Sequence, residues 1–459
     1  MDNNFKTFAN TFAEFLCGLK WENIPQDAKK AALDHFADWL ANAVAGSQTS
    51  LGKALYTIAS SVRGQGQSHL AGSLEQTHPL IAALVNSGSS HTLEFDDSHW
   101  IGLYHPGSPI IGAAFALAEN EGVKGKDFLA GIIGGYEVSI RISSAINPSH
   151  YQIWHTTGTV GTFGAASAAS RVAKFDVRTT LNTLGLAGLQ AAGLWEVLPN
   201  AAVAKGLHPA KAAQGGLLAA MLAREKIAGP ATILEGPSGF FKATVPDKVK
   251  TEKLCSDLGQ VWRILETALK PYPICGHIHS AAEAAFLLRE KVDPTQISRV
   301  LIYTNSTAIR VAGNRNPQDG YQAKFSIPYC LAVALLYGRI TQAEFSPEIL
   351  EDSKVRSLMG RMELAVEEEF ERVFEDVRPT RIEVITLDGR RFTTQSSNRR
   401  GGQEHPLSQE EKHGKFIQMA GSVWGEKAAT ILIENLEEIQ EMENVGKWLE
   451  NHLRLSGDS

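Results

Sequence analysis

The chain has 459 residues, of which 43% are hydrophobic and 20% are charged, so it is long enough to bury a large core and favours two or more domains. Its 41 glycines and 18 prolines are scattered without a period, which excludes collagen-like and low-complexity chains. A formal net charge of -6 argues against a nucleic-acid-binding protein, so we expect a small-molecule partner.

The four cysteines indicate the redox state of the cell compartment and predict no functional site. Their long, unequal spacing fits neither a disulfide framework nor a zinc or iron–sulfur ligand set. The N-terminal segment MDNNFKTFANTFAEF has no basic region followed by an apolar stretch, so it does not resemble a signal peptide. No segment approaches the ~18–20 consecutive apolar residues of a membrane span. We therefore predict a reduced, cytoplasmic protein that does not enter membranes.

Residues 8 to about 265 follow a helical period, with apolar residues at three- and four-residue steps. One amphipathic helix is expected over residues 26–46, where Ala32, Phe36 and Leu40 share a face and Gly46 offers a stop. Between residues 107 and 220 the helices become rich in alanine and glycine. Small residues let helix backbones approach each other closely, so this region predicts a tightly packed helical core.

Strands are expected only after about residue 266. Residues 297–305 predict a strand, and the alternating runs 381–386 and 391–395 flank Asp388-Gly389, which is a strong hairpin signal. Helices are expected at SAAEAAFLLREK, IPYCLAVALLYG and LEDSKVRSLMGRMEL, and again from Gln409 to Leu453. We predict a mainly α protein with a smaller α+β domain: a helical domain over 1–265, an α+β domain over 266–395, and C-terminal helices over 396–459.

The densest polar cluster is HTLEFDDSHW at residues 91–100, followed by His105 and a helix that begins near Pro109. Such a loop delivers carboxylates and imidazoles to a helix N-terminus, where free N–H groups favour an anion. A histidine placed there keeps its neutral form and is available as a base. The alternative is a capping segment in which Asp96 and Ser98 close turns.

Two further candidates each precede a helix rich in small residues. His155 stands before the segment GTVGTFG, in which helix packing explains the glycines but not a polar residue at the mouth of the helix. Lys205 lies in the segment AKGLHPAKAA, which also holds His208. Lys205 would reach a carboxylate as a point charge or serve as an acid, and the alternative is an ordinary surface lysine.

The segment KPYPICGHIHS at residues 270–280 lies where the helical part gives way to the α+β part, a type of boundary at which ligand sites concentrate. His277 and His279 are one residue apart, but no acidic or cysteine partner completes a ligand spacing, so we predict no metal. The glycine-rich runs GIIGG and LEGPSGF lack the features of a dinucleotide fingerprint or a phosphate loop. No nucleotide cofactor is expected.

Seven segments, in this order, resemble the MmgE/PrpD family, which includes 2-methylcitrate dehydratase, cis-aconitate decarboxylase and iminodisuccinate epimerase. The segments are LEFDDSHW, HPGSPIIGAA, GGYEVSIRI, WHTTGTVGTFGAASAAS, AKGLHPAKAAQGG, LEGPSGFF and KPYPICGHIHSAAEAA. The resemblance implies a large helical domain to which the C-terminal tail returns, an α+β lid inserted between its two parts, and a homodimer.

The resemblance to the decarboxylases of this family assigns site residues one by one. Glu94, Ser98 and His105 match the acid, hydroxyl and histidine of the first motif. The next histidine falls on His155, and the lysine falls on Lys205.

The last histidine of the family pattern leaves two positions open. Alignment on the form Cys-Gly-x-x-His selects His279, which we favour, and the dehydratase form selects His277.

Some residues depart from the family pattern. Vertebrate decarboxylases carry aspartate and threonine at the positions of Glu94 and Ser98, whereas fungal decarboxylases resemble Glu94 and the His99–His105 spacing more closely. Asp97 would therefore share or replace the role of Glu94. The first motif is unlike that of the standard bacterial methylcitrate dehydratases, which disfavours dehydration without selecting another reaction.

The resemblance implies a lyase without metal or other cofactor that acts by acid/base chemistry on a small di- or tricarboxylate. His105 or His155 would move a proton, and Lys205 with a helix N-terminus would bind carboxylates. His279 would close the site from the lid, and further substrate contacts are assigned to Arg141 and His208. The alternatives are an epimerase of a dicarboxylate such as iminodisuccinate and a helical binding protein without catalysis.

Overall fold

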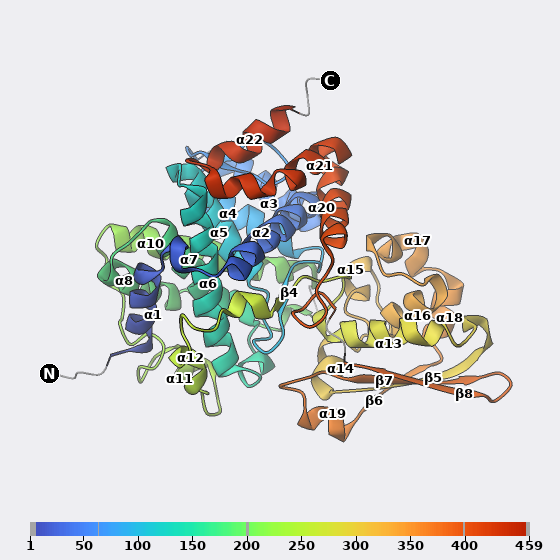
Figure 1. Ribbon diagram of the computed structural model, residues 1–459. Helices are drawn as coiled ribbons and strands as arrows, with labels where there is room; N and C mark the ends of the chain where they lie inside the picture. Colours follow the sequence, from blue (N-terminus) through green and yellow to red (C-terminus); the bar gives the residue numbers. More distant parts are fainter. Residues whose placement is uncertain (1–5, 63, 199–201, 398–399, 456–459) are drawn as a thin grey trace. The chain divides into compact units, whose positions relative to one another are not determined.

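The computed structural model describes residues 6–62, 64–198, 202–397 and 400–455 (Figure 1). The chain divides into two compact units, one made of Met1–Leu269 with Leu407–Ser459 and the other of Lys270–Pro406. The prediction of a mainly α protein with a smaller α+β part is confirmed. Among the described residues, no helix is long and apolar enough to cross a membrane.

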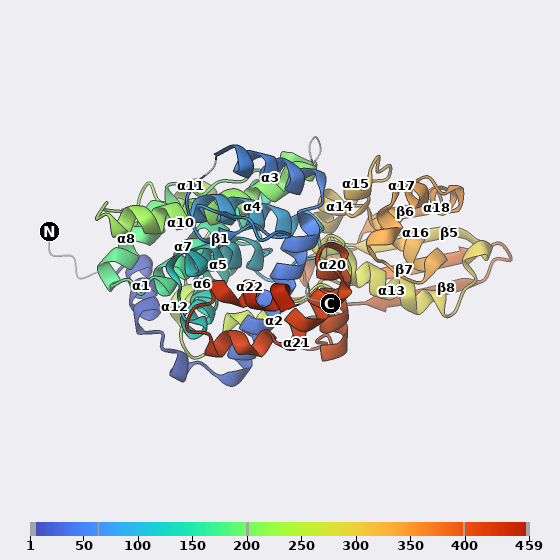
Figure 2. The same ribbon diagram turned by 90° about the horizontal axis from the view of Figure 1, so that it is seen from above.

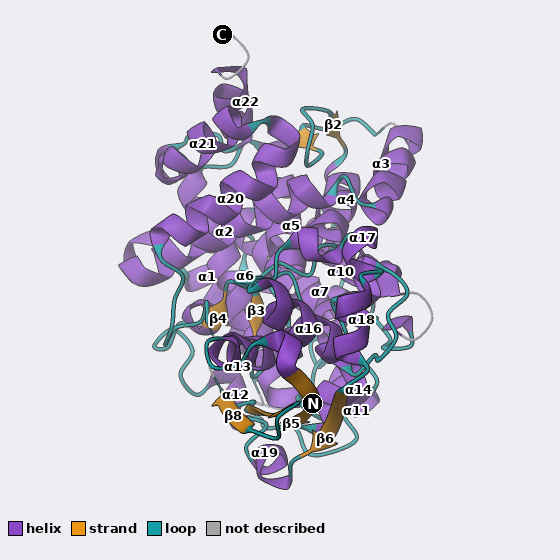
Figure 3. Ribbon diagram, turned by 90° about the vertical axis from the view of Figure 1, so that its right-hand side faces the viewer, coloured by secondary structure: helices purple, strands orange, loops and turns teal. Residues whose placement is uncertain are grey.

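The described part of the first unit is built almost wholly from helices, and the strands found there form two short antiparallel pairs, β1–β2 and β3–β4 (Figure 3). Its larger helices are α1 (Phe8–Gly18), α2 (Gln26–Gly46), α3 (Ser50–Val62), α4 (Pro79–His91), α5 (Gly107–Glu121), α6 (Gly125–Ile146), α7 (Thr156–Val172), α8 (Val177–Gly188), α10 (Leu207–Arg224), α20 (Gln409–Trp424), α21 (Glu426–Glu434) and α22 (Gly446–Leu455). Its short elements are α11 (Phe240–Thr244), α12 (Glu252–Cys255), β1 (Ser68–His69), β2 (Gln76–Thr77), β3 (Ser98–His99) and β4 (Thr267–Ala268).

The C-terminal helices belong to the core of this first unit, and α20 to α22 lie beside α2 (Figure 2). Phe36, on the apolar face predicted for α2, is fully buried. Its ring centroid lies 5.2 Å from that of Phe115 in α5 and 6.0 Å from that of Trp448 in α22. Aromatic contacts at these distances stabilise beyond the area they bury, so the tail is fixed by the same cluster as the N-terminal helices.

Small residues let the central helices α5, α6, α7 and α10 approach closely, as their composition predicts. A Cβ added at Gly216 in α10 would lie 2.6 Å from the backbone nitrogen of Ala166 in α7. One added at Gly135 in α6 would lie 2.9 Å from the carbonyl oxygen of Gly164 in α7. Neither separation tolerates a side chain, so these glycines set the spacing of the helices that carry the site.

The second unit contains a four-stranded sheet in the order β6-β5-β7-β8, covered on one face by α13 and α16. β5 pairs with β6 in parallel and with β7 antiparallel, and the predicted hairpin joins β7 to β8 through Gly389 at φ 84°. Its elements are α13 (His279–Arg289), β5 (Ile297–Thr304), α14 (Ser306–Ala312), α15 (Gly320–Ala323), α16 (Ile327–Tyr337), α17 (Pro347–Leu350), α18 (Ser353–Met359), β6 (Met362–Val366), α19 (Glu368–Arg372), β7 (Thr380–Thr386) and β8 (Arg391–Ser396).

The single helix expected over LEDSKVRSLMGRMEL is wrong in its second half. Helix α18 ends at Met359, and the chain then enters β6 at Met362. Met362 is fully buried and pairs with Val300 of β5. Pairing with a neighbouring strand outweighs local helix propensity here.

Candidate active site

The loop between α4 and α5 is held at both ends, and it carries four of the ten predicted site residues. Helix α4 ends at His91, whose side chain is fully buried. Further along, β3 pairs with β4 through Ser98 and Ala268. Asp97 then accepts a hydrogen bond from the backbone N–H of Gly107 at 2.9 Å, which satisfies a donor at the start of α5.

A buried chain of polar side chains runs through this loop to the short helix before α10. Nδ1 of His91 lies 2.6 Å from Oδ2 of Asp96, and its Nε2 lies 2.6 Å from Nζ of Lys205. The same Nζ lies 2.5 Å from Oε1 of Glu94. An ammonium at Lys205 donates to both partners, so Nε2 of His91 accepts and its Nδ1–H donates to Asp96.

Glu94 occupies an unusual backbone conformation in this chain, with φ at 55°. A non-glycine residue in the left-handed region is uncommon, and surrounding contacts must hold it there. The ion pair with Lys205 offsets the cost of burying the Glu94 carboxylate. Removing either partner would leave the other charge buried without its ion pair, which is costly.

His105 lies beside this row of buried polar side chains. Its Nδ1 is 2.8 Å from the carbonyl oxygen of Asp97 and 3.7 Å from Oδ2 of Asp96, and its ring centroid is 5.0 Å from that of His91. Because a carbonyl oxygen only accepts, Nδ1 of His105 carries a proton. Asp96 also accepts from the hydroxyl of Ser108 at 3.0 Å, at the start of α5.

His155 and His208 form an imidazole pair next to this row of polar side chains, with their Nδ1 atoms 2.8 Å apart. The ring of His155 lies 5.8 Å from that of His91. Burial and the nearby Lys205 ammonium hold the pKa of His155 well below its usual range. The same two causes lower the pKa of His208 to about 4. Both imidazoles are therefore neutral at pH 7.

A cation could in principle be held by His91, Asp96 and His105, whose potential ligand atoms lie within 4.8 Å of one another. However, Nδ1 of His91 and Oδ2 of Asp96 are only 2.6 Å apart. Two ligand atoms on a tetrahedral zinc with bonds near 2.0 Å would be separated by about 3.3 Å. The distance is that of a hydrogen bond, so the cluster as built fits proton sharing better than ion binding.

Asp97 and Ser98 lie in the same loop but have different surroundings. Oδ2 of Asp97 accepts from the Tyr136 hydroxyl at 2.6 Å and lies 3.0 Å from Nδ1 of His35. These contacts direct the Asp97 carboxylate towards α2, α5 and α6. Ser98 is half-buried in β3. The proposed roles of both residues stay predictions.

Arg141 is buried in α6 within a network of its own. Its guanidinium contacts the carboxylates of Glu137 and Asp257 and donates to the carbonyl oxygen of Val261 at 2.9 Å. Burial raises the pKa of Glu137 to about 7, an effect that Arg141 opposes. The structure thus gives Arg141 two carboxylate partners, and its assignment as a substrate contact stays a prediction.

His277 and His279 lie in the second unit, and both are buried. Nε2 of His279, the first residue of α13, is 3.4 Å from the carbonyl oxygen of Ile274. The His277 ring lies parallel to that of Phe374, with centroids 6.4 Å apart. The choice between the two histidines stays open.

The sequence motifs predict no role for His91 and only a turn-closing role for Asp96. In the structure, Asp96 accepts a hydrogen bond from His91, and His91 accepts one from Lys205. A usable signal was present: His91 ends an otherwise buried helix, and the acids follow it by three and five residues.

The fold and this cluster define a mainly helical protein with a buried cluster of lysine, histidine and carboxylate side chains in its larger unit. The chain matches the MmgE/PrpD N-terminal domain over residues 10–252 and the MmgE/PrpD C-terminal domain over residues 272–438. It belongs to the MmgE/PrpD family, and the resemblance noted in the sequence is confirmed.

Among its relatives are enzymes named for two reactions. It is 24% identical over 451 residues to a cis-aconitate decarboxylase of Aspergillus terreus, covering 93% of this chain and 92% of the relative. It is 27% identical over 466 residues to the cis-aconitate decarboxylase of Homo sapiens, covering 95% and 93%. A 2-methylcitrate dehydratase of Salmonella typhi is 24% identical over 348 residues, covering 69% and 70%.

Proposed function

We propose that the protein is a lyase that acts by acid/base chemistry on a small di- or tricarboxylate, with decarboxylation of cis-aconitate as the best-supported reaction. The observation that carries this proposal is the buried Lys205 ammonium between His91 and Glu94. The relatives named cis-aconitate decarboxylase add support, because they align over nearly the whole chain.

In this proposal, Lys205 binds a substrate carboxylate, since an ammonium in a buried site attracts an anion more strongly than in water. Loss of CO2 breaks a carbon–carbon bond and leaves the electron pair on carbon, which must then take a proton. Lys205 can supply that proton, because it holds three and is hydrogen-bonded to His91. Neutral His155 remains able to accept a proton from carbon or water, and His105 is a second candidate for that role.

Dehydration is the second candidate reaction, supported by the partial match to the 2-methylcitrate dehydratase of Salmonella typhi. In that reaction a histidine would remove a proton from the carbon next to a carboxylate, and the hydroxyl group on the neighbouring carbon would take a proton and leave as water. Epimerisation is a further alternative, because His105 and His155 could remove and return a proton from different sides. The alternative to an enzyme is a helical binding protein that has no catalytic activity.

The deciding experiment incubates the purified chain with cis-aconitate, 2-methylcitrate and iminodisuccinate and identifies the products by NMR. We expect CO2 loss from cis-aconitate. Lys205→Ala should lower kcat/KM by about 10²-fold or more. Lys211→Ala is the matched control, because Lys211 lies exposed on the adjacent helix α10 and pairs only with Gln214 among the described contacts. Full activity in Lys205→Ala would refute the proposed role, and no turnover of any substrate would favour a binding protein.

We further propose that Glu94, Ser98, Arg141 and His208 contact the substrate, that Asp97 shares the role of Glu94, and that the protein is a cytoplasmic homodimer. Light scattering of the purified protein at several concentrations tests the oligomeric state. A monomer mass at all concentrations would exclude the dimer.

A further inference from the structure

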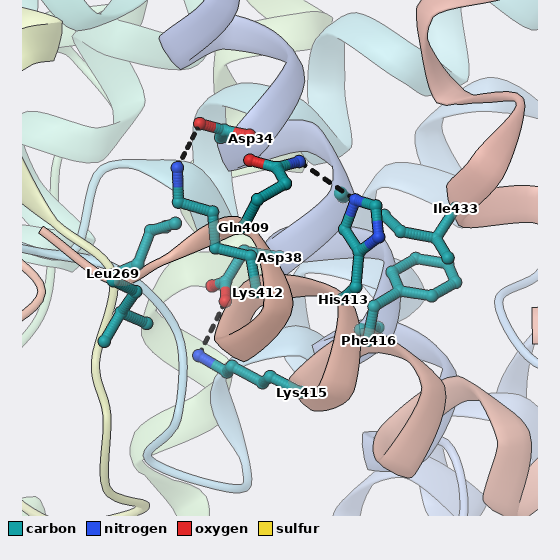
Figure 4. A pocket seen from close by; sticks show the side chains of 12 residues that line it. Asp34, Asp38, Leu269, Gln409, Lys412, His413, Lys415, Phe416 and Ile433 are labelled. Atoms are coloured by element: carbon teal, nitrogen blue, oxygen red, sulfur yellow. Dashed lines mark hydrogen bonds and ion pairs between the residues drawn. The ribbon is translucent and has the colours of Figure 1, made fainter. Parts of the chain in front are cut away.

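A buried lysine on the C-terminal helix α20 reaches back to the site loop. Nζ of Lys415 lies 2.6 Å from Oδ1 of Asp38 in α2 and donates to the carbonyl oxygen of Phe95 at 2.7 Å. Figure 4 shows the pocket between α2 and α20, in which Lys415 points to Asp38 while Lys412 points to Asp34. The two lysines thus form parallel ion pairs, but only the pair of Lys415 is joined to the loop.

Phe95 stands between two acids of the site, Glu94 and Asp96. Its carbonyl oxygen also accepts from the Asn42 amide at 3.4 Å. Its ring lies under the Lys415 ammonium, with 3.8 Å between Nζ and the ring centroid. A cation over an aromatic face is attracted to it, so Lys415 holds Phe95 through both its backbone and its side chain.

The contact of Lys415 with Phe95 bears on the site because the adjacent residue, Glu94, has a left-handed backbone conformation. Such a conformation is costly and persists only where neighbouring contacts fix it. Lys205 fixes the Glu94 side chain, at 2.5 Å. Lys415 fixes the following peptide through the carbonyl oxygen of Phe95.

The ion pair itself does not explain a lysine at this position. Only 8% of the Lys415 side chain and 5% of the Asp38 side chain are exposed. Replacing a buried ion pair by apolar residues of similar size is often neutral or stabilising, so this pair is weak evidence for a stabilising role. Its contact with the Phe95 carbonyl accounts for the charge better.

We propose that Lys415 is a positioning residue of the site, which holds the Phe95 peptide and so presents Glu94 to Lys205 and Asp96 to His91. The inference rests on the proposed function of the site and adds the C-terminal helix to it. The loop that carries the acids is then fixed by a segment more than 300 residues away in the chain, since the Lys415–Phe95 contact spans 320 positions.

The test compares Lys415→Gln with Lys412→Gln, which removes the neighbouring charge from the same helix. Lys412 pairs with Asp34 at 2.6 Å, and 19% and 13% of the two side chains are exposed. We expect Lys415→Gln to raise the KM for cis-aconitate by about tenfold, because displacing a binding group by about 1 Å is costly. Lys412→Gln should stay within about twofold of the wild type.

A purely structural role would lower the folded fraction, and with it the apparent kcat, but would leave KM unchanged. If Lys415→Gln does not fold, Asp38→Asn/Lys415→Gln removes the unpaired carboxylate as well, and its KM decides the same comparison. A folded variant with the wild-type KM would overturn the proposal, and so would an equal effect in Lys412→Gln.

A second measurement separates this inference from the proposed function. Deuterium uptake of the peptide covering residues 92–99 needs no substrate, and we expect about tenfold faster exchange in Lys415→Gln than in Lys412→Gln. If the wild type turns over no carboxylate, the proposed function fails, and the exchange rates alone decide the positioning role. Wild-type exchange in Lys415→Gln would overturn that role.

Discussion

Nζ of Lys205 lies 2.6 Å from Nε2 of His91, and both side chains are almost completely buried. The contact joins the end of α4 to the segment before α10, which come from positions 114 residues apart. Because the other His91 nitrogen donates to Asp96, the imidazole is fixed in one tautomer and one orientation. His91 therefore orients the Lys205 ammonium, and the Asp96 carboxylate orients His91.

Replacing His91 should separate its two contacts. In His91→Gln the amide reaches approximately to the Nε2 position and keeps a partner for Lys205. In His91→Asn the amide reaches only to the Nδ1 position and keeps a partner for Asp96. We expect kcat/KM to fall about 10²-fold in the asparagine variant and about tenfold in the glutamine variant, measured with the substrate identified by NMR.

Circular dichroism and thermal unfolding of both His91 variants provide the control, because each removes one contact of a buried partner. Similar melting temperatures with unequal kcat/KM values would support the aiming of Lys205. Equal losses in both variants would mean that the contact with Lys205 carries no special weight.

Acid should weaken the folded state through His208. Its pKa is lowered to about 4 by burial and by the Lys205 charge, whereas an unfolded histidine titrates near 6.5. Between these values the unfolded chain binds more protons, so the free energy of unfolding falls as the pH falls from about 6.5 to about 4. His208→Gln should reduce this slope by up to about 1.4 kcal/mol per pH unit.

Urea unfolding at several pH values across that window measures the slope. His155, whose pKa is also lowered by burial and Lys205, contributes in the same direction and remains in the variant. The comparison therefore rests on the difference between the two slopes. Identical slopes would show that His208 titrates normally in the folded protein.

The fold was predictable where local signals agree with tertiary packing. The hairpin at Gly389 follows from Asp-Gly between two alternating runs, and α2 follows from its apolar face. Residues 362–366 were not predictable, because their strand exists only through pairing with β5. Local periodicity carries no information about a partner that lies 62 residues earlier.

The candidate site was predictable as a set of motifs but not as a network. The sequence places Glu94 and His105 in one polar segment and His155 and Lys205 in two others, and the structure brings the four residues together around His91. The partner of Lys205 follows from how α4 meets the segment before α10, which no spacing within a motif encodes. The family resemblance named the lysine, and only the packing shows that His91 supports it.

Glu94 offers a test of the backbone conformation that is independent of activity. Glu94→Gly and Glu94→Ala both remove the carboxylate, but only glycine accepts φ 55° without strain. We expect the glycine variant to be the more stable of the two by about 1 kcal/mol in chemical unfolding. At an ordinary position alanine would be favoured instead, since glycine gains more entropy on unfolding.

Lys226 provides the matched comparison, because it also has a positive φ, of 66°, and lies exposed at the end of α10. Lys226→Gly should likewise be more stable than Lys226→Ala, without any loss of kcat/KM. A more stable alanine variant at position 94 would contradict the left-handed conformation of Glu94.

His279 and His277 are distinguished by what each contacts in the second unit. The His277 ring packs parallel to Phe374, so His277→Asn should mainly lower the melting temperature. His279 begins α13, its Nε2 lies 3.4 Å from the carbonyl oxygen of Ile274, and its ring centroid lies 5.8 Å from that of Tyr272. Since the resemblance to the family pattern favours His279, we expect His279→Asn to lower kcat/KM about 10²-fold. Steady-state kinetics and thermal unfolding of both variants give the two readouts, and a larger kinetic loss in His277→Asn would assign the role to His277 instead.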